Sequence, residues 1–153
     1  MKKLKIVTGE DTEILRTVCA EVPRFDAELK SFVEAMRKAM IKARGLGIAA
    51  PQVGENRRVF ITTLDYKKKT QMMIAMVNPE ITWFSEEMEI DEEGCLSLPG
   101  IYAKVERARA VKVEFFNLDG GRQVMELEGL NARVVQHELD HLNGVLFIDK
   151  LAE

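Results

Sequence analysis

The chain has 153 residues, of which 46% are hydrophobic and 31% charged, with a formal net charge of -3. This length suits one domain with a buried core, and the charge balance excludes the strongly basic surface typical of nucleic-acid-binding domains. The lysines at the N-terminus precede no apolar stretch, so we expect no secretory signal and no membrane span; a cytoplasmic protein is expected, with organellar or viral origin left open.

The first predicted element is a long helix between Phe25 and Arg44. Its apolar residues recur at helical spacing, namely Phe25, Leu29, Phe32, Val33, Met36 and Met40. Asp26 can cap the start of this helix, and Gly45 can end it. We predict that the methionine and phenylalanine stripe faces the core.

The glycine-rich stretch GLGIAAPQ, residues 45–52, follows this helix. It lacks both the Lys-Ser/Thr pair of a phosphate-binding loop and the G-x-G-x-x-G pattern. Its small side chains predict an extended backbone that could pair with a peptide as an added strand, although a simple helix-to-strand connection explains it equally well. The Gln52 amide at its end could donate to an oxyanion.

Strand-like runs occupy the middle of the chain: 58–64, 73–77, 81–84, 111–116 and 123–127. Asn78-Pro79 separates the second run from the third, and the lysines at 67–69 are interpreted as a solvated hairpin tip. A second helix is predicted over 130–142, ending near Gly144, and 145–148 is predicted to pack as a final strand. This order indicates one α+β domain over residues 1–153 rather than alternating βαβ units.

The only two histidines lie in the motif QHELDHLNG, where His137 and His141 flank Glu138. On a helix, residues four apart share a face, so both imidazoles can bind one ion. Glu138 can reach a water at that ion, as in the H-E-x-x-H motif of metal hydrolases. Two randomly placed histidines would take this spacing only about once in eighty chains, which weighs against coincidence.

A catalytic metal site of this kind uses three protein ligands, so the third must be a cysteine or a carboxylate. Cys95 lies in EGCLSLP, where Gly94 permits a close approach of the backbone. Cys19 lies in LRTVCAEV, which has no glycine, and is interpreted as a small buried hydrophobe. We therefore favour Cys95.

The motifs GLGIAAPQ, EGCLSLP and QHELDHLNG, in this order, closely resemble those of peptide deformylases, and Ile14-Leu15-Arg16 is also similar to that family. The resemblance covers about residues 5–151. It implies antiparallel strands packed around a central HExxH helix, with a long N-terminal helix. It also implies a hydrolase that removes the formyl group from the N-terminal formyl-methionine of new polypeptides and releases formate.

By motif position, the resemblance implies that Cys95, His137 and His141 bind the metal. Fe(II) is expected, and Zn(II), Ni(II) or Co(II) can replace it. Glu138 would take a proton from the attacking water and pass it to the leaving amine. The Gln52 side chain and the Leu96 backbone N–H would stabilise the oxyanion.

Four residues are candidates for binding the substrate: Leu46, Gly47, Leu130 and Val134. Leu130 and Val134 share a helix face with His137. Arg133 is expected near the rim of the pocket, with its charge in solvent. Glu93 and Arg107 are interpreted either as a pair that orients a ligand or as a surface ion pair, and Asp140 is equally ambiguous.

The implied partners are formyl-methionyl peptides and nascent chains. The C-terminal helix by which some relatives contact the ribosome does not follow Glu153, so ribosome docking is not inferred. A small metallopeptidase is an alternative, but it would need a ligand after the second helix, where only Asp149 and Glu153 are acidic. A catalytically inert metal- or peptide-binding relative is another alternative, and it would be expected to lack Glu138 or Gln52.

Overall fold

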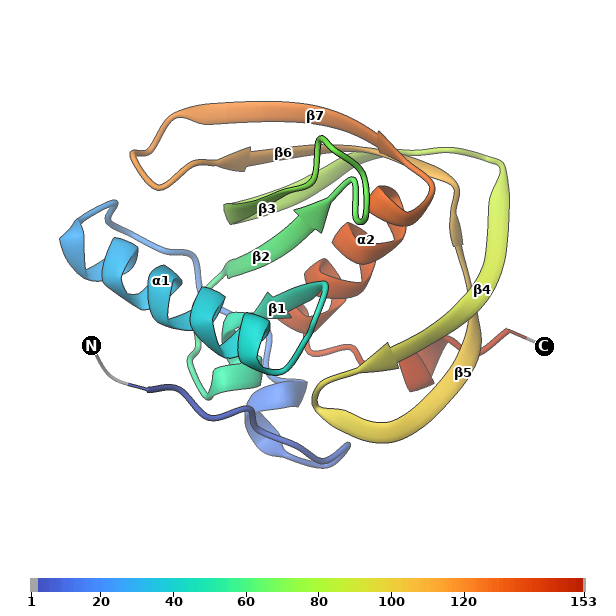
Figure 1. The fold of residues 1–153 in the computed structure, drawn as a ribbon, viewed down its shortest axis with the longest axis horizontal. Coiled ribbons are helices and arrows are strands. Elements are labelled where there is room, and N and C mark those ends of the chain that lie inside the picture. Colours follow the sequence, from blue (N-terminus) through green and yellow to red (C-terminus); the bar gives the residue numbers. More distant parts are fainter. Residues whose placement is uncertain (1–2, 153) are drawn as a thin grey trace.

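Two antiparallel sheets surround one central helix in the computed structural model, which describes residues 3–152 (Figure 1). The larger sheet has the order β1-β2-β3-β6-β7, comprising β1 (Gly47–Ala49), β2 (Val59–Leu64), β3 (Met72–Phe84), β6 (Ala110–Phe116) and β7 (Arg122–Glu128). The smaller sheet pairs β4 (Met88–Cys95) with β5 (Leu98–Ala108). The predicted α+β class is confirmed.

The central helix α2 (Leu130–Leu142) has the predicted bounds. It packs on β1 and β2 on one side, while β4 and β5 curve past its other side (Figure 1). Most of its residues are buried, including both histidines and Glu138. Cys19 donates its backbone N–H to Leu142 O, and Arg58 also donates to this carbonyl, so the last turn of α2 is tied to the rest of the fold.

The long N-terminal helix α1 (Ala27–Lys42) is confirmed, with the Asp26 side chain accepting from Leu29 N at 3.0 Å. Its predicted stripe is buried in the core, except for partly buried Phe25. The predicted end of α1 is displaced by one residue. The residue with a left-handed backbone conformation after the helix is Arg44 (φ 59°) rather than Gly45. Gly45 instead leaves room for Leu96, since a Cβ there would lie 2.7 Å from a Leu96 methyl carbon and would displace that side chain.

Two predicted strands are a single strand in the structure. β3 runs through Asn78-Pro79, with Asn78 at φ 48° and a shift in its pairing with β6 between Val77 and Glu80. The Asn78 side chain accepts from Val22 N and donates to Val22 O, which stabilises this irregularity. The proline therefore bends the strand instead of ending it.

The predicted final strand over 145–148 is wrong. Residues Phe147–Lys150 form a short 3-10 helix, η3, and the Asp149 side chain accepts from Leu146 N at 3.0 Å. Two other 3-10 helices are η1 (Glu13–Arg16) and η2 (Ala50–Val53). Phe147 is buried and stacks on the His137 ring with the centroids 6.0 Å apart, so this segment supports the site.

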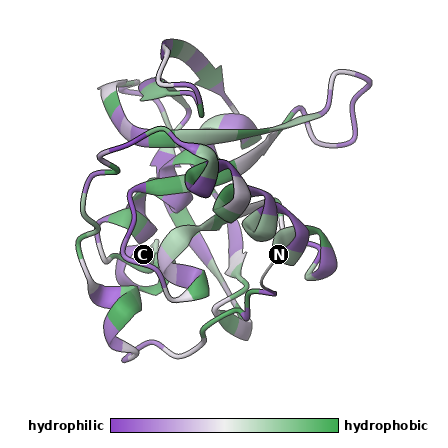
Figure 2. Ribbon diagram, turned by 90° about the vertical axis from the view of Figure 1, so that its left-hand side faces the viewer, coloured by the Kyte–Doolittle hydropathy of each residue, from purple (hydrophilic) through white to green (hydrophobic). Residues whose placement is uncertain are grey.

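Strands β1, β4 and β5 carry no clear strand signal in the sequence. Residues 88–92 of β4 are all exposed, the apolar ones included, so the alternation of burial that marks a half-buried strand is missing. Hydrophobic and hydrophilic residues otherwise alternate along most elements, as expected for elements that share one core (Figure 2). Within residues 3–152, no helix is long and apolar enough to cross a membrane.

Candidate metal centre and active-site pocket

Three potential metal-binding side chains converge where β4 meets α2. Cys95 is the last residue of β4, and His137 and His141 lie one turn apart on α2. Their ligand atoms all lie within 4.8 Å of one another, and Cys95 Sγ is 3.3 Å from His141 Nε2. Cys19 instead lies in the hydrophobic core, as the sequence indicated.

The two imidazoles have different surroundings. Glu93 Oε1 accepts from His137 Nδ1 at 2.9 Å, which directs Nε2 of that ring away from the carboxylate. Burial lowers the pKa of His137, but Cys95, Glu93 and Glu138 outweigh it and raise the pKa to about 10. Burial, with His137 and Arg107, lowers the pKa of His141 well below its ordinary value, so that imidazole is neutral. A neutral imidazole beside a second imidazole and a cysteine thiol suits a divalent cation.

Glu138 is buried beside this group of ligands. It is 4% exposed, and its Oε1 has no hydrogen-bond partner within the described residues. Burial raises its pKa to about 7, so this carboxyl can accept and release a proton near neutral pH. Buried polar atoms normally have partners, so the free oxygen indicates that a water or substrate binds here.

Gly47 leaves the space that the Glu138 side chain occupies. A Cβ at this position would lie 2.6 Å from Glu138 Oε2 and 2.9 Å from its Cδ and Cγ. The glycine is therefore required by close packing against the carboxylate.

Replacing Gly47 with alanine is expected to displace the Glu138 carboxylate. A misplacement of about 1 Å can lower a rate by about 10²-fold, so kcat of the hydrolysis expected from the motifs should fall by that order. Steady-state kinetics at saturating metal measures the effect. Wild-type kcat in Gly47→Ala would show that the position of this carboxylate is not critical.

The Gln52 amide has a defined orientation in the pocket. Its Oε1 accepts from Ala49 N at 2.9 Å, and because that N–H can only donate, the amide nitrogen must face the opposite way. Nε2 then donates to Ser97 Oγ at 3.2 Å and lies 3.5 Å from Cys95 Sγ. The motif EGCLSLP contains Ser97, but nothing in the sequence pattern indicates this contact.

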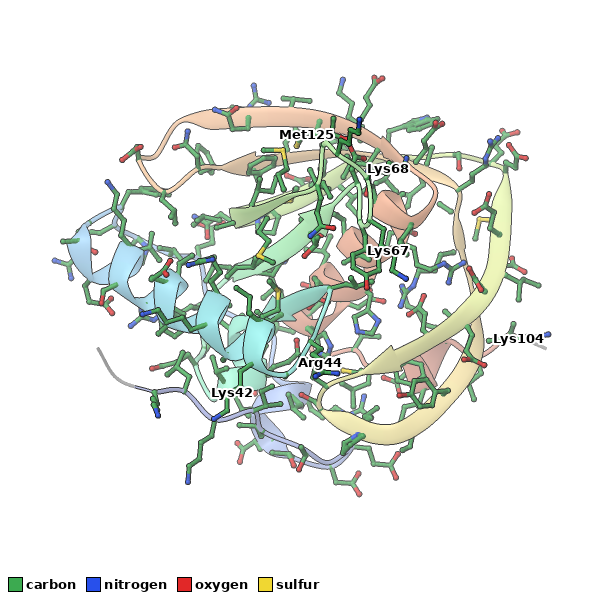
Figure 3. All side chains as sticks on the ribbon, in the orientation of Figure 1. Lys42, Arg44, Lys67, Lys68, Lys104 and Met125 are labelled. Carbon is green, nitrogen blue, oxygen red and sulfur yellow. The ribbon has the colours of Figure 1, made fainter. Side chains whose placement is uncertain are left out.

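A pocket of about 490 Å³ opens onto Cys95, His137 and Glu138, while His141 lies behind them and is not part of its lining. All four predicted substrate-binding residues line it, namely Leu46, Gly47, Leu130 and Val134, and Leu96 does as well. Leu130 is 47% exposed at the mouth, while Val134 is buried. Arg44 also lines the pocket, near the end of β4 (Figure 3).

Arg133 does not reach solvent as predicted. It is 6% exposed and donates to Glu93 Oε2 at 2.6 Å, to Val105 O at 2.9 Å and to Glu89 O at 2.7 Å. The helical pattern places Arg133 near the pocket. The groups that accept its hydrogen bonds lie on β4 and β5, two strands that the sequence pattern does not predict. The prediction failed because those strands were missed.

Glu93 and Arg107 form a buried pair rather than a surface pair. Arg107 donates from Nε and Nη2 to both oxygens of Glu93, at 2.6 and 2.9 Å. Burial raises the pKa of Glu93, but bonds from His137 and Arg107 outweigh it and lower the pKa to about 2. Arg107 also donates to Asp140 Oδ2 at 2.8 Å, and Asp140 pairs with Lys150. Asp140 is thus linked to His137 through two intervening residues, Arg107 and Glu93.

The comparisons with known proteins agree with this geometry. The model of the polypeptide deformylase family matches residues 3–153. The chain belongs to this family.

Among the relatives, the peptide deformylase of Brucella suis biovar 1 is 46% identical over 140 residues, covering 92% of this chain and 80% of that one. The crystal structure of peptide deformylase from Thermotoga maritima superposes with a TM-score of 0.93 at 40% identity, covering all of both chains. A Met-Ala-Ser-bound structure of the Acinetobacter baumannii enzyme has a TM-score of 0.91 at 39% identity, covering 98% and 99%.

Peptide deformylases are metal-dependent hydrolases that remove the N-formyl group from nascent polypeptides, and the resemblance stated from the motifs is confirmed. The peptidase alternative is not favoured. Asp149, its one candidate ligand within the described residues, accepts from Arg16 and from Leu146 N instead. Glu153 lies outside those residues.

Proposed function

We propose that this chain deformylates formyl-methionyl peptides with Cys95, His137 and His141 as metal ligands. The observation that carries the assignment is the convergence of these three donors beside a buried oxygen of Glu138 that has no partner within the described residues. Cys95, His137 and Glu138 line one pocket. A divalent ion held there would act as a Lewis acid on the formyl carbonyl and would lower the pKa of a water molecule.

Glu138 is positioned to handle the proton. It takes a proton from the water that attacks the formyl carbon, and it returns this proton to the nitrogen that leaves with the peptide. Because the carboxyl is buried and its pKa is raised to about 7, both transfers are feasible near neutral pH. The products are formate and a free methionine amine.

The oxyanion that forms during attack is assigned to Gln52 Nε2 and the Leu96 backbone N–H. The bond from Ala49 N to Gln52 Oε1 keeps the donor side of the amide toward the cysteine. A donor held in place before the reaction stabilises developing charge without reorganisation. Leu96 lines the same pocket, directly after Cys95.

Gln52→Ala is expected to lower kcat by about 10²–10³-fold, the usual effect of losing one oxyanion donor. Gln52→Glu is the sharper variant because it keeps an acceptor for Ala49 N–H while removing the donor. Both rates should fall, and both can be measured as formate release. Normal kcat in Gln52→Glu would show that the amide does not donate in the transition state.

The substrate side chain is assigned to the pocket wall formed by Leu46, Leu130 and Val134. The volume of the pocket, about 490 Å³, lies within the range of small-ligand sites. The complex of the Acinetobacter baumannii relative with Met-Ala-Ser supports a peptide that begins with methionine. The backbone near Gly47 can pair with that peptide as an added strand, because β1 is the edge of its sheet.

Fe(II) is the metal that we propose for the protein in the cell, with Zn(II), Ni(II) or Co(II) as substitutes. One thiolate and two imidazoles accept all of these ions, so availability decides between them. The cytoplasm, where formylated nascent chains are made, is the proposed location.

The test is an anaerobic purification followed by loading with Fe(II) or Ni(II) and measurement of formate release from formyl-Met-Ala-Ser. Activity should disappear with a chelator and return when metal is restored. Binding of one metal ion per chain without formate release would contradict the proposed reaction. Equal activity in the metal-free protein would contradict the assigned ligands.

A further inference from the structure

The metal-binding residues belong to two separate parts of the fold. Cys95 ends one strand of the small β4–β5 sheet, whereas both histidines lie on α2. Within the described residues the small sheet makes no strand pairing with the five-stranded sheet. The alignment of the thiolate with the imidazoles therefore depends on packing, to which the contacts between β4–β5 and α2 contribute together with those to η3.

Arg133 makes several of these contacts from the first turn of α2. Nη2 donates to Glu89 O on β4 at 2.7 Å, and Nη1 donates to Val105 O on β5 at 2.9 Å. Nη1 also lies 2.6 Å from Glu93 Oε2, on β4 two residues before Cys95. One buried guanidinium thus joins the helix to both strands of the small sheet.

The Glu93 carboxylate that accepts from Arg133 also contacts a histidine. Glu93 Oε2 faces Arg133, and its Oε1 accepts from His137 Nδ1 at 2.9 Å. Arg107 holds the same carboxylate from a third side and is itself bonded to Asp140. The carboxylate that orients His137 therefore has its position fixed by Arg133 on α2 and Arg107 on β5.

The position of Arg133 in the pocket also requires explanation. It lines a wall that otherwise includes Leu130 and Val134. Its charge is compensated by the Glu93 carboxylate and two carbonyls, so the guanidinium does not present a free charge to an apolar side chain. A residue that only formed the wall would not need to be an arginine.

We propose that Arg133 is a positioning residue for the metal centre: it fixes the small sheet carrying Cys95 against the helix carrying the histidines and orients His137 through Glu93. The proposal rests on the ligand assignment made above. Residues that orient metal ligands typically change metal affinity by about 10–100-fold when they are replaced.

The test compares Arg133→Met with Arg109→Met. Methionine keeps an unbranched stem at 133 but donates no hydrogen bond. Arg109 is the matched control because it is an arginine outside the pocket, between β5 and β6, with a side chain that is 47% exposed and pairs with Glu87 at the surface. The readouts are the Co(II) affinity of the metal-free protein, the Co(II)–thiolate absorption band, and kcat and KM for formyl-Met-Ala-Ser.

Arg133→Met is expected to weaken Co(II) binding by about 10–100-fold and to alter the thiolate band. It should lower kcat while leaving KM close to the wild-type value, and Arg109→Met should change neither. Arg133→Lys keeps the charge next to Glu93 but cannot bond to both strands, so its affinity should be intermediate.

Wild-type Co(II) affinity and an unchanged band in Arg133→Met would overturn the proposal. If Arg133→Met does not fold, the same measurements on Arg133→Lys test the proposal. Unchanged Co(II) affinity and an unchanged thiolate band in Arg133→Lys would also overturn the proposal. A wild-type protein that binds Co(II) without a thiolate band would instead contradict the ligand assignment, so the two failures can be distinguished.

Discussion

Glu138→Gln is expected to lower kcat by about 10²–10⁴-fold, the usual contribution of a positioned acid–base group. Glutamine has nearly the same shape but cannot take the proton of the attacking water. The metal should remain bound at full occupancy, because Glu138 is not among the three converging ligands. Formate release and metal analysis of the same sample measure both effects.

Glu126→Gln is the matched control for this change, because it removes an exposed carboxylate on β7 outside the pocket. It should leave kcat unchanged. If Glu138→Gln kept full activity with metal bound, the proton would have to move through another group, and the assigned mechanism would be wrong.

Glu93→Ala is expected to have the largest effect on stability. It leaves two buried cations, Arg107 and Arg133, without their shared carboxylate. Breaking a buried ion pair by removing one partner typically costs about 3–5 kcal/mol, because the remaining charge is desolvated and uncompensated. Denaturant unfolding of the metal-free protein measures the loss of free energy.

The control for Glu93→Ala is Glu87→Ala. Glu87 pairs with Arg109 at the surface, with side chains 66% and 47% exposed, and such pairs contribute about 0–1 kcal/mol. A loss below about 1 kcal/mol in Glu93→Ala would mean that water enters and solvates the two arginines.

The sequence predicted the parts of this protein that repeat a local pattern. Both long helices follow from the spacing of apolar residues, and α2 has the expected bounds. The two histidines could be placed on one face because an α-helix fixes the relation between residues four apart. Cys95 was chosen by the flexibility of its glycine neighbour and by elimination.

The contacts around Glu93 could not be predicted in the same way. They join residues 89, 93, 105, 107, 133 and 140, which are distant in the chain. Four of them lie on β4 and β5, where residues 88–92 and 99–102 are exposed without a break, so burial does not alternate as in a half-buried strand. The sequence therefore indicates that Arg133, a charged residue on the pocket side of α2, reaches solvent. In the structure it is buried together with the groups that pair with it.

The separation of Cys95 and His137 along the chain has a consequence for the life of the protein. A metal bound by both would close a loop of 137 - 95 = 42 positions, and such a cross-link removes conformations that are open only to the unfolded chain. Ligands that bind only the folded state also stabilise it by mass action. Metal supply would then set the survival of the protein against proteases as well as its rate of turnover, so starvation for metal would shorten its lifetime.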